Sequence, residues 1–118
     1  MALHYRELIA WQKAMDLVVD VYRLTQGFPR EELYGLTNQL RRAAVSVPSN
    51  IAEGQGRGNG PAFAHFLRIA NASLQELETQ VLIAERLGYT KEGSIAPIME
   101  KSAEVGRIIV GLLRSLDV

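Results

Sequence analysis

The 118-residue chain has the length of one ordinary domain, and 47% hydrophobic with 22% charged residues is a globular composition. Thirteen basic and thirteen acidic side chains cancel, which excludes a global field that would steer the protein onto nucleic acid or an anionic membrane. The absence of Cys excludes disulfides, thiol nucleophiles and thiolate metal sites. We expect a single domain over residues 1–118.

The start of the chain, Met1 to Glu7, has no basic stretch followed by an apolar core, so we do not expect a signal peptide. No apolar run approaches the roughly 18 residues that a membrane-spanning helix requires. We therefore expect a cytoplasmic protein with no membrane partner.

The first segment with helical spacing covers residues 8–26 and ends at Gly27-Phe28-Pro29, because Gly suits a helix C-terminus and Pro cannot continue a helix. Its apolar residues form two adjacent stripes, which predicts a helix with two packing partners. The stripes are Leu8, Trp11, Met15, Val18 and Tyr22, and beside them Ala14, Leu17, Val21 and Leu24.

The second predicted helix covers residues 31–53, with Glu31 and Glu32 in its first turn, where the helix dipole favours acidic groups. Pro48 predicts a kink, because its ring removes one backbone hydrogen bond while neighbouring Ser hydroxyls can satisfy the freed groups. The expected core stripe is Leu33, Leu36, Leu40, Ala44, Val47 and Ile51.

A glycine-rich loop is predicted at residues 54–60, followed by helices at 61–87 and 92–117. Helices of about 20 residues joined by short links favour antiparallel neighbours. The predicted fold class is therefore all-α, an antiparallel up-down-up-down four-helix bundle. Its helices carry more apolar surface than one subunit can bury, so we expect copies to associate into a homo-oligomer.

The residues predict no catalytic or metal site, and therefore no cofactor. His4 and His65 lack the Glu-x-x-His spacing of a di-iron bundle, and Ser46 and Ser49 have no His base on the same helix face. The glycine-rich loop with Arg57 has two interpretations, a phosphate-binding turn or a plain connection between helices.

Polar residues recur along the second predicted helix. Ser and Asn in a helix interior oppose helix propensity, which favours a hydrogen-bond and ion-pair network around the kink over a solvated face. These residues are Asn38, Arg42, Ser46, Ser49 and Glu53, with Asn50 beside them.

Residues 33–75 are locally basic, because Arg41, Arg42, Arg57 and Arg68 stand against Glu53 alone. Guanidinium groups bind phosphate in a bidentate manner, and a ring of subunits would repeat the patch, so the four arginines are candidate nucleic-acid contacts. The alternative is that they form ion pairs within a helix or between subunits. No aromatic residues interleave with them in a stacking pattern, which argues against single-strand binding.

Several blocks distributed over nearly the whole chain resemble one family. They are Tyr5-Arg-Glu-Leu, Trp11-Gln-Lys-Ala, Glu32-Leu-Tyr-Gly-Leu-Thr, Gln39-Leu-Arg-Arg-Ala-Ala-Val-Ser, Asn50-Ile-Ala-Glu-Gly and Ser73-Leu-Gln-Glu-Leu-Glu-Thr. The sequence resembles the four-helix-bundle proteins encoded within intervening sequences of bacterial 23S ribosomal RNA genes, most densely from Gln39 to Gly54.

This resemblance implies an antiparallel four-helix bundle in a homopentameric ring. Relatives of that family include the accessory variability proteins of diversity-generating retroelements, which bind nucleic acid and a reverse transcriptase. By position, the family's basic motifs and its Asn-Ile-Ala-Glu-Gly signature fall on two groups of residues. These are Arg41, Arg42 and Arg57 for the basic motifs, and Asn50, Glu53 and Gly54 for the signature.

Together these features lead to the hypothesis of a homo-oligomer that is not an enzyme and that binds RNA or DNA phosphates through repeated arginines. The alternative is a structural adaptor that binds a protein partner and has no nucleic-acid role.

Overall fold

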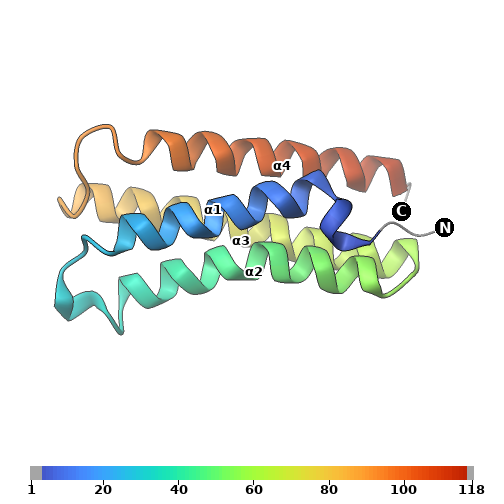
Figure 1. Cartoon of the computed structure of the whole chain (residues 1–118), viewed down its shortest axis with the longest axis horizontal. Helices are drawn as coiled ribbons and strands as arrows, with labels where there is room; N and C mark the ends of the chain where they lie inside the picture. The colour runs from blue at the N-terminus through green and yellow to red at the C-terminus, as the bar shows by residue number, and fades with distance from the viewer. Residues whose placement is uncertain (1–3, 117–118) are drawn as a thin grey trace.

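The computed structural model describes residues 4–116, which contain four α-helices and no strand (Figure 1). The α-helices are α1 (Ile9–Thr25), α2 (Leu36–Gly56), α3 (Gly60–Arg86) and α4 (Ala96–Leu116). Two short 3-10 helices, η1 (Tyr5–Glu7) and η2 (Arg30–Glu32), precede α1 and α2. The all-α prediction is confirmed, while position 117, the predicted end of the fourth helix, lies outside the described residues.

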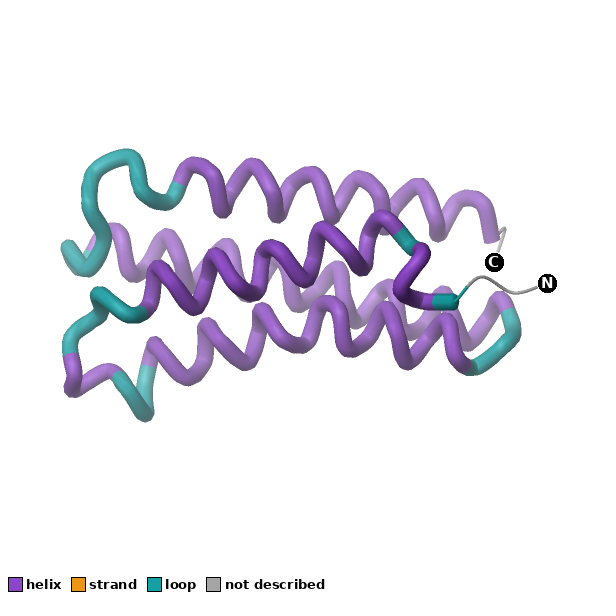
Figure 2. Tube along the Cα trace, in the orientation of Figure 1, coloured by secondary structure: helices purple, strands orange, loops and turns teal. Residues whose placement is uncertain are grey.

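The four helices lie side by side along the 46 Å long axis of the molecule (Figures 1 and 2). α2 packs against α1 and α3, and α4 packs against α3 and α1, so that α1 and α3 are diagonal to one another. The prediction that the first helix has two packing partners is therefore confirmed. The α2–α3 turn lies at one end of the molecule, and the α1–α2 and α3–α4 connections lie at the other (Figure 2).

The two apolar stripes of α1 differ in burial. Ala14, Leu17 and Val21 are fully buried, whereas Met15 and Tyr22 in the other stripe are 41% and 40% exposed. The buried stripe faces the core shared with α2, α3 and α4. The other stripe lies at the border of that core, where Trp11 and Val18 are only partly buried. This leaves apolar surface on the outside of the helix.

The predicted start of the second helix at residue 31 is wrong. Residues 30–32 form η2, and α2 begins only at Leu36, because Gly35 has a non-helical backbone with φ −112° and ψ −115°. Leu33, expected in the core stripe, is consequently 47% exposed. At its other end α2 continues through Pro48 and on to Gly56, so the predicted loop at 54–60 shortens to residues 57–59.

The predicted bounds of the third helix hold to within one residue, but α4 begins four residues later than the predicted position 92. Gly88 and Gly93 both adopt φ +79°, a left-handed conformation that favours glycine and that turns the chain before α4 can start. The buried residues of α4 are Ile98, Ser102, Val105 and Ile109.

Gly54 allows α2 and α3 to approach closely. A Cβ atom at this position would lie 2.7 Å from Phe66 Cβ and 3.1 Å from Phe63 Cδ1, both on α3. Phe66 Cβ belongs to the base of its side chain and cannot move away without moving the helix. Gly54 is therefore required by packing, which explains why a helix tolerates its low propensity there.

We expect Gly54→Ala to lower the free energy of unfolding by about 1–3 kcal/mol, as overpacking of a tight core contact does. Gly56→Ala is the matched control, because a Cβ atom there meets nothing within 4 Å, and its stability should stay equal or rise by up to about 1 kcal/mol. Urea denaturation followed by circular dichroism compares the two variants. Equal stability of both variants would contradict the packing role of Gly54.

Glu32 joins the two connections at one end of the molecule. Its Oε1 accepts a hydrogen bond from the Leu36 backbone N–H at 3.0 Å, and its Oε2 accepts one from the Tyr89 hydroxyl at 2.9 Å. These two bonds, the backbone bond first, lower the pKa of the Glu32 carboxyl below its ordinary value of 4.5. The same carboxylate raises the pKa of Tyr89.

A carboxyl whose pKa is lower in the folded state stabilises the fold above its ordinary value, and this contribution is lost as the pH falls through the folded pKa. We therefore expect Glu32→Gln to be less stable than the wild type at neutral pH, with the difference shrinking well below pH 4.5. Thermal unfolding over a pH series measures this difference. Glu31→Gln, the same charge change at an exposed neighbour, is the control, and a Glu32→Gln deficit that persists unchanged in acid would contradict the assignment.

Candidate nucleic-acid interface

A surface groove of about 770 Å³ lies where α1 and α2 approach η2. It is lined by Tyr22, Leu33, Tyr34, Thr37, Asn38, Arg41, Arg42, Val45 and Ser46. An adjoining depression of about 370 Å³ shares Leu33, Thr37 and Arg41 with it and adds Arg30. We call the two together the arginine groove. No Asp or Glu belongs to the residues that line it.

Arg41 is held in place by two side chains of α1. Its Nε donates a 2.8 Å hydrogen bond to Thr25 Oγ1, and its guanidinium carbon lies 4.6 Å from the centroid of the Tyr22 ring. Thr25 is buried and its hydroxyl donates in turn to the Val21 carbonyl at 2.8 Å. Because the guanidinium is already oriented, the binding of an anion by its terminal amino groups costs little further side-chain entropy.

Arg30 and Arg42 are exposed, and neither forms an ion pair with another residue of the described part of the chain. The acidic residues closest in sequence are Glu31, which is exposed, and Glu32, whose carboxylate is engaged by Leu36 and Tyr89. The groove therefore gathers three positive charges without a neutralising partner among its lining residues. This arrangement suits an anionic ligand.

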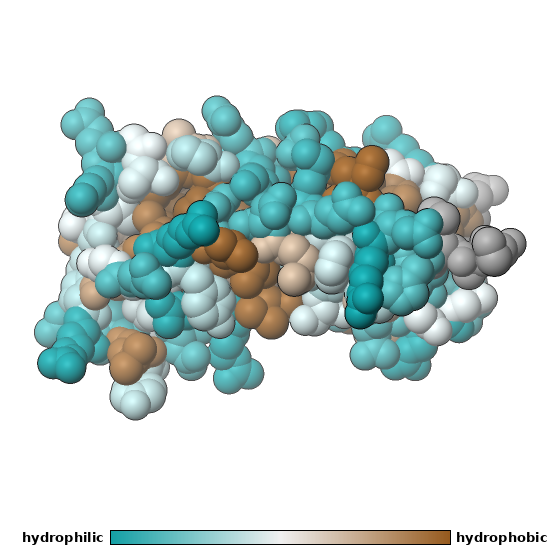
Figure 3. Space-filling view, in the orientation of Figure 1, coloured by the Kyte–Doolittle hydropathy of each residue, from teal (hydrophilic) through white to brown (hydrophobic). Residues whose placement is uncertain are grey.

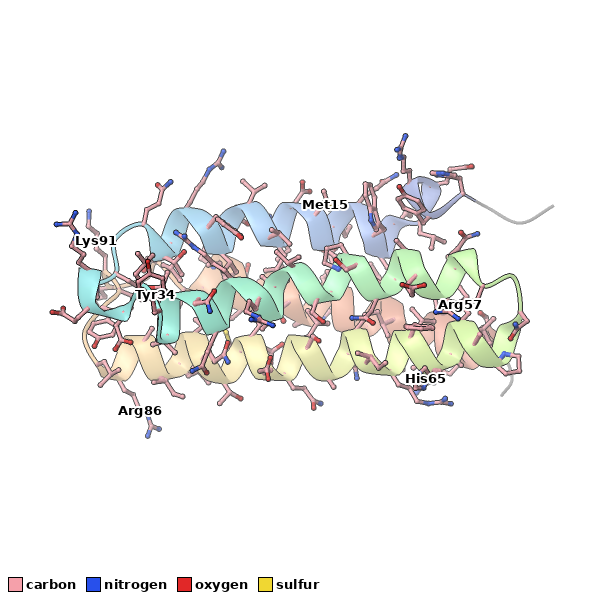
Figure 4. All side chains as sticks on the ribbon, turned by 90° about the horizontal axis from the view of Figure 1, so that it is seen from below. Met15, Tyr34, Arg57, His65, Arg86 and Lys91 are labelled. Atoms are coloured by element: carbon pink, nitrogen blue, oxygen red, sulfur yellow. The ribbon has the colours of Figure 1, made fainter. Side chains whose placement is uncertain are left out.

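Tyr34 extends from the connection between η2 and α2 and is 91% exposed. Figure 4 shows it next to η2, at the end of the molecule opposite Arg57. Although no aromatic residue interleaves with the arginines along the sequence, Tyr22 and Tyr34 line the same groove as Arg41 and Arg42.

The structure separates the four arginines that were predicted as contacts. Arg57 lies 15 residues beyond Arg42, about 22 Å along the helix direction, and Figure 4 shows it at the far end of α2. Its Nη2 is 3.1 Å from Glu53 Oε2, and its guanidinium lies 5.0 Å from the Phe66 ring centroid. The ion-pair interpretation is thus confirmed for Arg57. Arg68 is exposed on α3, which does not line the arginine groove.

The predicted polar network is confirmed for Ser46 and Asn50. Ser46 Oγ lies 2.8 Å from Ser73 Oγ on α3, and Asn50 Nδ2 donates to Ser46 O at 2.8 Å and to Ser46 Oγ at 2.9 Å. The network therefore joins α2 to α3 close to Pro48. Ser49 and Asn38, predicted for the same network, are exposed instead.

A second groove, of about 670 Å³, continues along α1 and α2 from the shared residue Val45. We call it the Trp11 groove, and its wall includes Trp11, Met15 and Val18. Its charged residues Glu53 and Arg57 neutralise one another. Figure 3 shows hydrophobic surface near the middle of this face, between hydrophilic regions on either side.

Within residues 4–116, no group of three or more His, Asp or Glu side chains is placed to hold a metal ion. His65 is exposed and packs its ring edge-on against Phe66, with centroids 5.2 Å apart. None of the helices in this range is long and apolar enough to cross a membrane.

The fold places the chain among small all-α proteins of four packed helices. The model of the 23S rRNA-intervening sequence protein family matches residues 6–111, and the chain belongs to this family. The resemblance noted in the sequence is thereby confirmed.

The fold is similar to a crystal structure of a protein of unknown function from the S23 ribosomal protein family of Bacteroides thetaiotaomicron. The TM-score is 0.80 at 18% identity, over 90% of this chain and 99% of that one. This similarity supports the fold. No curated protein matches the chain.

Proposed function

We propose that this protein is a cytoplasmic, homo-oligomeric nucleic-acid-binding protein, not an enzyme, whose subunit is an up-down-up-down four-helix bundle. The observation that carries the proposal is the arginine groove, where Arg30, Arg41 and Arg42 line one surface that has no acidic lining residue. RNA or DNA phosphates are ligands that match guanidinium groups in charge and geometry.

The neutral net charge is compatible with this function because binding depends on local charge. Three arginines make few phosphate contacts, so one subunit alone would bind weakly at physiological salt. Repetition of the groove around an oligomer raises the effective concentration of the second and later contacts, which strengthens binding without new chemistry. The proposed oligomer and the proposed ligand therefore support each other.

Exposed apolar side chains on two separate helices favour self-association. Met15 and Val19 on α1 are 41% and 46% exposed, and Leu82 and Ile83 on α3 are 43% and 44% exposed. Because α1 and α3 are diagonal, a two-fold dimer would cover one of these surfaces, whereas a head-to-tail contact pairs the two and forms a ring where the rotation between subunits closes. The family resemblance implies a pentamer.

Light scattering coupled to size exclusion tests the oligomer. We expect the wild type to elute at a small multiple of its 13.1 kDa subunit mass, and Ile83→Glu to dissociate, because it places a charge in an apolar contact. Gln75→Glu, the same charge at an exposed polar position of α3, should leave the mass unchanged. A wild-type monomer that persists at high concentration would refute self-association.

The nucleic-acid role is tested with two double variants of equal charge change. We expect Arg30→Gln with Arg42→Gln to weaken RNA binding and to flatten its salt dependence, by about 0.7 in the log–log slope for each phosphate of a single strand that is no longer neutralised. Arg86→Gln with Arg114→Gln removes two exposed arginines from α3 and α4 and should bind like the wild type. Equal RNA affinity of the two double variants would contradict the proposal. The absence of RNA or DNA binding by the wild type at low salt would contradict it as well.

The Trp11 groove supports a second candidate function, a structural adaptor for a protein partner. Its neutral and largely apolar wall fits an amphipathic helix better than a nucleic acid. Under this alternative, removal of Arg30 and Arg42 leaves the partner bound, so the same double variant separates the two functions.

A further inference from the structure

We infer that the arginine groove selects single-stranded over double-stranded nucleic acid, with an unpaired base stacked on Tyr34 and the neighbouring phosphates held by Arg41 and Arg42. The inference rests on the proposed function and goes beyond it by naming the form of nucleic acid that the groove recognises.

The position of Tyr34 is the first argument. Its ring lines the groove and yet is 91% exposed, so it takes no part in the core of the protein. Exposed aromatic rings beside basic side chains are the platforms on which proteins stack the bases of single strands. A duplex hides the faces of its bases within the helix, and its bases cannot reach a ring of this kind.

The different environments of Arg41 and Arg42 are the second argument. Arg41 is half-buried and fixed by Thr25 and Tyr22, whereas Arg42 is exposed at the adjacent position of α2. A fixed guanidinium at Arg41 and an exposed one at Arg42 provide two successive contacts to one phosphate backbone. Tyr22 does not compete with Tyr34 for a base, because Arg41 already lies over its ring.

The polar lining of the groove is the third argument. Asn38 is exposed and carries both a donor and an acceptor, which suits the edge of an unpaired base. Leu33, 47% exposed, adds apolar surface beside Tyr34. The groove thus offers charge, a ring and an amide together, whereas phosphate binding alone would need only the charge.

Fluorescence anisotropy with the intact protein tests the inference. The probes are a short labelled RNA of mixed sequence, the same RNA annealed to its complement, and inorganic polyphosphate as an unlabelled competitor. We expect the wild type to bind the single strand about tenfold more tightly than the duplex at the same salt concentration.

Tyr34→Ala should weaken binding of the single strand about tenfold, leave duplex binding within about twofold, and leave the salt dependence unchanged, because it removes a ring and no charge. Tyr34→Phe keeps the ring and should restore single-strand binding. The exposed position lets both variants keep the unfolding midpoint of the wild type, so a change in binding reports on the groove and not on the fold.

Four results would overturn the inference. If Tyr34→Ala binds the single strand like the wild type, or if the duplex binds as tightly, the groove reads phosphates alone and only the proposed function stands. If polyphosphate displaces the RNA equally well from the wild type and from Tyr34→Ala, the RNA is again held by charge alone. If the wild type binds no oligonucleotide at low salt, both the inference and the proposed function fail.

Discussion

The close packing of α2 on α3 is the constraint on which the rest of the structure depends. Gly54 brings the two helices together at one end of the contact, and the Ser46–Ser73 pair with Asn50 joins them further along. Both surface grooves lie along the contact between α1 and α2. α2 therefore packs closely on α3 through one side and contributes residues to both grooves through another.

The cationic side chains differ in whether an acidic neighbour neutralises them. Lys13 and Lys101 pair with acidic partners between α1 and α4, and Arg57, which follows α2, pairs with Glu53 of that helix. Arg30, Arg41 and Arg42 have no such ion-pair partner among residues 4–116, and they line one groove. A chain of zero net charge can thus carry a positive surface, because cancellation over the whole sequence says nothing about where the charges lie.

Helical spacing was sufficient to predict four helices. It failed to predict where α2 begins, and the residues before Leu36 show why. The apolar Leu33 continues the stripe of α2, but the stripe cannot report that Gly35 leaves the helical backbone or that Glu32 bonds to Leu36. The predicted polar network includes Ser46 and Asn50 but not Ser49 and Asn38. The spacing along one helix could not separate them, because the partner of Ser46 lies 27 residues away on another helix. The sequence did not predict three residues of the groove or its support, Arg30, Thr25 and Tyr22. They precede the basic stretch 33–75, and Thr25 and Tyr22 meet Arg41 only through the α1–α2 contact. Tyr34, in contrast, is an aromatic residue inside that stretch and could have been named from the sequence.

The bond between Glu32 and Tyr89 connects the groove to the rest of the molecule. η2 carries Arg30 and leads directly into Tyr34, and its last residue is tied to the α3–α4 connection through the Tyr89 hydroxyl. The outer wall of the groove is therefore anchored at the end of the molecule where the α1–α2 and α3–α4 connections lie. In the proposed ring, symmetry would place every groove at an equivalent position, so that a strand long enough to pass from one groove to the next would meet the same side chains again.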